Sequence, residues 1–281
     1  MMSRCVVAVV ALLLVWCVTA VHSDNAEQTN AILVDMKLSA KQMTVVIEQA
    51  RERLKSNLAA LAGDKMTVKE KTRSVQGART LCVLLAAYAD AGPVENVNPP
   101  VVLRENALRL GVAVQEGKWT EANKLWKELL PAEKVSELPK KTALFGPSDH
   151  VALVKGIMIL LRSRDRGGLG SEPAPKDLSD DGLEAVLRIL ETEPKKAAAL
   201  KREDLLRLSW QTAILAEMTR LAPPPSATGR KKDIWNDSTR EMREQALKLA
   251  RAVKEEKNLE TLSNLAGKIN TACIDCHRVF P

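Results

Sequence analysis

Aromatic side chains are scarce in this sequence, which has one Tyr, two Phe and five Trp among 281 residues. Proteins that bind single-stranded nucleic acids stack the bases on aromatic side chains inside a basic groove. Here basic and acidic residues are interspersed, and the short basic run at 229–233 has the composition of a solvated loop. The sequence therefore argues against nucleic acid as a partner.

Cysteine and histidine are also few, with five Cys and three His. A zinc site normally takes four ligands from two separated pairs, yet beyond residue 23 the only close pair of cysteines is Cys273 and Cys276. Cys82 lies in an apolar run, where a buried and inert thiol is expected. The sequence therefore favours neither a zinc site nor a disulfide framework.

Strand patterns and phosphate-binding loops are missing as well. The glycine run at 167–170 follows no strand and precedes no Gly-Lys-Ser/Thr, so a linker is expected there. Apolar residues instead recur at helical spacing, as at Leu183, Val186, Leu187 and Leu190. The sequence predicts an all-α fold, with helices at residues 81–91, 149–162, 178–190 and 205–222 and a final helix from residue 259.

The one long apolar run lies at the N-terminus, at residues 5–18, between Arg4 and the polar residues that begin at His22. This pattern is typical of a secretory signal peptide and is too short for a spanning helix. Cleavage after Ala20 or Ser23 satisfies the small-residue rule, and we take residues 1–23 as the signal; an uncleaved anchor is the alternative. The mature chain is expected in the periplasm, without stable membrane insertion.

The formal net charge is +7, and 41 basic and 35 acidic residues remain beyond residue 23. A mildly positive protein favours acidic partners or an anionic surface. We therefore expect a partner protein with an acidic docking surface. The sequence leaves the oligomeric state open, with a homodimer as one candidate.

The chain ends in CIDCHRVFP, which contains the C-x-x-C-H pattern of covalent haem attachment. On a helix, Cys273 and Cys276 share a face and His277 projects beside them. The two thiols can add to the two vinyl groups of one porphyrin edge, and the imidazole of His277 can bind the iron as an axial ligand. A thioredoxin-like redox dithiol is the alternative interpretation of the two cysteines. Such a pair normally lies between a strand and a helix, and the sequence shows no convincing strand.

Two segments separated by 139 positions resemble each other. Residues 103–130 and 242–269 share ten identical residues over 28 aligned positions, and an apolar helix that ends at proline precedes each. A duplication predicts one unit at residues 24–146 and a second at 147–281, each a bundle of about four antiparallel helices. The positions that match Cys273, Cys276 and His277 are Lys134, Glu137 and Leu138. One haem per chain is therefore expected.

The C-terminal half resembles the class II c-type cytochromes, the cytochrome c′ and c556 group. The resemblance covers residues 205–280 and rests on a helix that opens near Trp235 and on a final helix that carries the haem motif near its end. The tandem form is similar to multi-domain cytochrome-like proteins of planctomycete-type bacteria, which have a similar Gly-Gly-Leu-Gly loop. The resemblance implies two tandem bundles of the cytochrome c′ type. Family members with a methionine on the first helix are six-coordinate electron carriers, and members without it bind small gases such as nitric oxide.

The residue opposite His277 therefore decides between two functions. Met158 lies in the helix expected at 149–162 and is the first candidate; His150, Met218 and an open position are the alternatives. Arg278 is a candidate contact for a haem propionate or the proximal imidazole, and Phe280 for the porphyrin or the end of the bundle.

We expect a non-catalytic periplasmic c-type cytochrome that carries one covalent haem c and transfers one electron at a time. A five-coordinate protein that binds a small gas is the main alternative. A haem-bearing subunit whose first unit docks onto an oxidoreductase is another, and a haem-free dithiol protein is the last.

Overall fold

The computed structural model describes residues 40–63, 66–91, 100–129, 150–166, 168–170, 181–197 and 200–280. Within these residues the chain forms α-helices and one short 3-10 helix, and it has no β-strand, so the predicted all-α fold is confirmed. The signal peptide expected at 1–23 and the unit boundary expected near residues 146–147 lie outside the described residues. The helices are α2 (Ala40–Leu61), α3 (Val68–Ala91), α4 (Pro100–Gln115), α5 (Trp119–Lys127), α6 (His150–Leu160), α7 (Leu183–Thr192), α8 (Pro194–Ala197), α9 (Arg202–Leu221), α10 (Arg230–Lys254) and α11 (Leu259–Val279).

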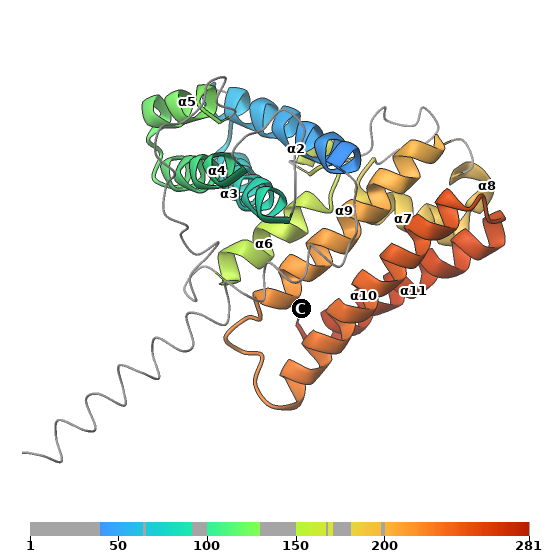
Figure 1. Cartoon of the computed structure of the whole chain (residues 1–281). Helices are drawn as coiled ribbons and strands as arrows, with labels where there is room; N and C mark the ends of the chain where they lie inside the picture. Colours follow the sequence, from blue (N-terminus) through green and yellow to red (C-terminus); the bar gives the residue numbers. More distant parts are fainter. Residues whose placement is uncertain are drawn as a thin grey trace, which may run out of the picture.

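Helices α2 to α5 pack together as successive neighbours in the N-terminal half (Figure 1). Thr67 and Glu70 begin α3 with a capping box, in which the Thr67 amide donates to Oε2 of Glu70 at 2.8 Å and the Glu70 amide donates to Oγ1 of Thr67 at 3.3 Å. The middle of α3 is apolar on every side, and residues 81–89 are all buried. A helix that is hydrophobic all round must be covered by neighbours on all sides, and α2, α4 and α6 cover α3.

Helices α9, α10 and α11 form the C-terminal half, and α7 packs against α11 (Figure 1). Trp235 joins α10 to α9, because its buried indole N–H donates to the carbonyl of Thr219 at 3.1 Å. Arg202, the first residue of α9, caps the far end of α10 by donating from Nε to the carbonyl of Val253 at 2.8 Å. A cation at a helix C-terminus is favourable because the last carbonyls have no partner in the helix.

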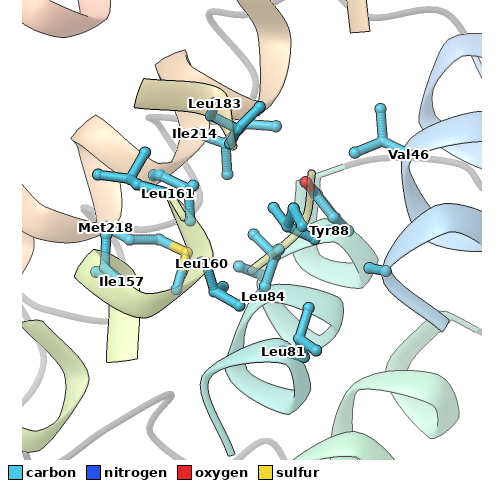
Figure 2. Close-up of a cluster of buried hydrophobic side chains, with 14 of the residues drawn as sticks. Val46, Leu81, Leu84, Tyr88, Ile157, Leu160, Leu161, Leu183, Ile214 and Met218 are labelled. Atoms are coloured by element: carbon cyan, nitrogen blue, oxygen red, sulfur yellow. The ribbon is translucent and has the colours of Figure 1, made fainter. Parts of the chain in front are cut away.

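Helix α6 lies between the two halves. Figure 2 shows Leu160 of α6 between Leu84 of α3 and Met218 of α9, with Ile157 of α6 beside Met218. The buried apolar side chains of both halves belong to one continuous cluster. Helix α6 also packs more extensively on α3 than on α9. The sequence assigns α6 to the second unit, whereas in the structure its principal neighbour is α3 of the first.

The α4–α5 and α10–α11 hairpins turn in the same way, at positions 139 residues apart. The amides of Glu116, Gly117 and Lys118 donate to carbonyls four, three and five residues earlier, and the three amides at 255–257 repeat this pattern. Gly117 has a φ of 69° and Glu256 a φ of 55°. A glutamate in the left-handed region is uncommon, so the shared backbone is not a consequence of a shared glycine.

Within the described residues, no helix is long and apolar enough to cross a bilayer.

Candidate functional site

The C-x-x-C-H motif lies in the last two turns of α11. Cys273, Cys276 and His277 line one cavity of about 260 Å³, which we call the inner cavity. This is the geometry that the spacing predicts, because residues at i, i+3 and i+4 share one face of a helix. Ile274 lines neither this cavity nor its neighbour and is exposed, and Asp275 pairs with Arg278 at 3.1 Å.

The wall of the inner cavity is mainly apolar. It includes Met158 from α6, Leu161 just after the end of α6, Leu187 from α7 and Met242 from α10. Both threonine hydroxyls in the wall are used within their own helices: Thr219 donates to the carbonyl of Leu215 and Thr239 to that of Trp235, each at 2.7 Å. Donors satisfied in this way do not compete for a ligand, so the cavity suits an apolar body.

A second cavity, of about 610 Å³, adjoins the first, and we call it the outer cavity. The two share Met158, Arg162, Cys276 and His277 as lining residues. The outer cavity is also lined by the rings of Trp235 and Phe280, which pack edge to face with their centroids 5.1 Å apart. Together the two cavities follow the motif face of α11 and then open past its end.

The charge in the outer cavity has one sign. Arg73, Lys155, Arg162 and Lys231 line it, and no Asp or Glu is found among its described lining residues. In the inner cavity Glu184 accompanies Arg162. The combined space therefore has largely apolar walls and a group of cations around the outer cavity, which suits a ligand with an apolar body and anionic groups.

Both thiols of the motif are held in their protonated form. Burial raises the pKa of Cys273 to about 12, with smaller contributions from the charges of Glu184 and Cys276. Burial likewise raises the pKa of Cys276 to about 11. Reactive dithiols lie at helix N-termini, where the dipole stabilises a thiolate, whereas these thiols lie at a C-terminus, where the dipole opposes it. The Cys273 sulfur instead lies 3.9 Å from the sulfur of Met242.

We therefore expect these thiols to be slow nucleophiles in the haem-free chain. With a pKa of about 11, Cys276 has on the order of a hundredfold less thiolate at neutral pH than a thiol of ordinary pKa. Iodoacetamide labelling followed by peptide mass spectrometry should give rates that keep rising above pH 9. A labelling rate that levels off near pH 7 would contradict this expectation and favour a redox dithiol; the chain unfolded in urea is the control.

The same pKa values predict how stability depends on pH. Because folding raises the pKa of both thiols, the unfolded chain loses these protons first, so the free energy of unfolding should fall as pH rises from about 9.

Of the other residues that the sequence analysis proposed for the site, some line the cavities and some do not. Met158 is part-buried and lines both cavities beside His277. His150 lines neither, and its Nδ1 lies 3.1 Å from the carbonyl oxygen of Pro223. Met218 is buried in the core and also lines neither cavity (Figure 2). Of the two residues expected near a haem, Phe280 lines the outer cavity, whereas Arg278 is exposed and lines neither.

Some residues of the site were missed by sequence reasoning. Arg73 on α3 and Glu184 on α7 line the cavities although they are far from the motif in sequence. No spacing pattern links either residue to α11, because only the packing of the helices brings them together. Cys82, expected as a buried inert thiol, is fully buried in α3, and burial raises its pKa.

The residues present suit a covalently held haem. Its apolar macrocycle suits the apolar walls of the two adjoining cavities, and its two carboxylates suit the cations of the outer cavity. Cys273, Cys276 and His277 would supply the attachment and an axial ligand. Among the described residues, no group of three or more His, Cys, Asp or Glu side chains is arranged to hold a metal ion by itself. A haem iron requires none, because the porphyrin supplies four of its ligands.

No protein-family model matches this chain, and neither a curated protein nor a solved structure shows significant similarity to it.

Proposed function

We propose that the protein is an exported, non-catalytic c-type cytochrome with one covalent haem c that carries single electrons. The observation that carries the proposal is the gathering of Cys273, Cys276 and His277, from α11, with Met158, from α6, around one cavity. When bound, haem would supply a reversible one-electron couple, tuned by its axial ligands and by nearby charge. The resemblance to the cytochrome c′ group agrees with this assignment.

Each residue of the site has a separate part in the proposal. Cys273 and Cys276 would hold the porphyrin edge, and His277 would bind the iron. Met158 is the candidate for the opposite axial position, because it lines both cavities together with His277. The apolar wall would exclude water from the porphyrin face, and the T-shaped Trp235–Phe280 pair would cover the open end.

The turns at Gly117 and Glu256 share the same backbone hydrogen bonds and a positive φ. This similarity supports the predicted duplication into two tandem bundles, with residues 24–146 as the unit without a haem motif. Periplasmic location and an acidic redox partner also belong to the proposal, and they rest on the apolar N-terminal run and the positive charge. The raised thiol pKa values stand against the dithiol alternative.

Replacement of Met158 tests the electron-carrier assignment against the gas-binding alternative. If Met158 is the sixth ligand, the reduced wild-type protein is low-spin and does not respond to carbon monoxide. The Met158→Ala variant should then become high-spin and bind carbon monoxide, as absorption spectra of the purified protein would show. Met218→Leu is the matched control, because Met218 is buried but lines neither cavity; its spectrum should be unchanged.

A low-spin spectrum that survives in Met158→Ala would reject Met158 as the ligand. A wild-type protein that is already high-spin and shifts with carbon monoxide would reject the electron carrier and favour a five-coordinate, gas-binding protein.

A further inference from the structure

The cations of the outer cavity come from both halves of the chain. Lys155 and Arg162 belong to α6 and the residues just after it, and Lys231 to α10, whereas Arg73 belongs to α3 of the N-terminal half. Gln76, one turn further along α3, lines the same cavity. The half that lacks a haem motif therefore contributes part of the wall beside His277.

Close packing fixes the position of α3 against the site. Gly156 of α6 faces α3 so closely that an added Cβ would lie 1.7 Å from Oγ1 of Thr80. Helix α6 carries Met158, and Arg162 lies two residues after the end of the helix; both residues line the two cavities. The contact that joins the halves thus also sets how far Arg73 lies from the motif face of α11.

Arg73 is also suited to a carboxylate. A guanidinium presents several N–H donors in a planar fork that matches a carboxylate. The nearest acid on its own helix, Glu70, is a neighbouring charge. However, one carboxylate oxygen of Glu70 already accepts from the amide and the hydroxyl of Thr67, at 2.8 and 2.7 Å. Arg73 is part-buried, and a charge-assisted hydrogen bond there is screened less by solvent than one on an open surface.

We propose that Arg73 binds an anionic carboxylate of the ligand in the outer cavity, so that the N-terminal half completes the binding site of the C-terminal half. This inference rests on the proposed function, in which the ligand is haem and the carboxylates are its propionates. It gives the unit without a haem motif a role within the same molecule, as a source of positive charge beside the haem.

The test compares midpoint potentials of the full-length holoprotein. A cation near the haem favours the reduced, less positive iron, so Arg73→Gln should lower the potential. Arg73→Lys, which keeps the charge, should stay close to wild type. Lys124→Gln makes the same change of charge on α5, where the side chain is 75% exposed, and should have a much smaller effect. Thermal unfolding followed by circular dichroism would check that all the variants are folded.

A potential that is equally unchanged in Arg73→Gln and Lys124→Gln would overturn the inference while leaving the proposed function intact. An Arg73→Lys variant that shifts as far as Arg73→Gln would also overturn it, because charge would not be the cause. A wild-type chain without haem would overturn the proposed function itself and this inference with it.

Discussion

The Cys273→Ala, Cys276→Ala double variant is expected to carry no covalently bound haem after expression with the haem-attachment machinery. Both thiols line the inner cavity on one face of α11, and each would form one thioether. Loss of both sulfurs removes both bonds, so denaturation should separate the chain from any haem that His277 still holds. Intact mass spectrometry under denaturing conditions, with haem staining of a denaturing gel, would measure the loss.

The single variants give a graded result. Each should keep one thioether, so its reduced pyridine haemochrome band should shift from the position typical of two thioethers toward that of free haem. Cys82→Ala is the matched control, because Cys82 is fully buried in α3 and lines neither cavity. It should attach haem normally. Full attachment in the double variant would show that the motif is not the attachment site.

Gly156→Ala is expected to destabilise the folded chain by about 3 kcal/mol, an overpacking effect at the upper end of the usual range. The new Cβ would lie 1.7 Å from Oγ1 and 2.9 Å from Cβ of Thr80, and 3.1 Å from the carbonyl oxygen of Gln76. Helix α6 would have to move away from α3, which would also shift Met158 and Arg162 in the site. Urea denaturation of the haem-free chain would measure the change in the free energy of unfolding.

A second glycine provides the control for Gly156. At Gly267 of α11 an added Cβ would meet the carboxylate of Glu191 at 3.1 Å, and this flexible side chain can move. Alanine is also favoured over glycine within a helix by about 1 kcal/mol, so Gly267→Ala should be neutral or stabilising. Adding Thr80→Ala to Gly156→Ala removes the worst clash and should restore part of the stability. Equal stability of Gly156→Ala and wild type would mean that α3 and α6 are not packed as closely as described.

Helix positions were largely predictable because apolar periodicity and proline are local signals. The helix predicted at 205–222 is α9, at Arg202–Leu221, and it ends before the prolines that begin at Pro223. The final helix begins at Leu259, as expected. The four apolar residues from Leu183 to Leu190 are all buried on α7. The common face of Cys273, Cys276 and His277 followed from spacing alone.

The contacts between distant segments were not predictable. The spacing of apolar residues indicates which face of a helix is buried but not which neighbour covers it. The packing of α6 on α3 could therefore not be predicted. In the sequence Gly156 is an ordinary glycine in an apolar run. Only the structure, which places Thr80 beside it, explains why no side chain fits at this position. In the sequence Arg73 is one of 42 basic residues, and only its position in the wall of the outer cavity distinguishes it as a candidate site residue.

The haem content of the mature wild-type chain is the most direct test of whether the motif holds a covalent haem. The chain would be exported from cells that contain the haem-attachment machinery, purified from the periplasm, and analysed by denaturing intact mass and by the pyridine haemochrome spectrum. We expect one haem per chain, bound through two thioethers, with Cys82 as the only free thiol. A chain without haem, with Cys273 and Cys276 both open to alkylation after denaturation, would contradict it.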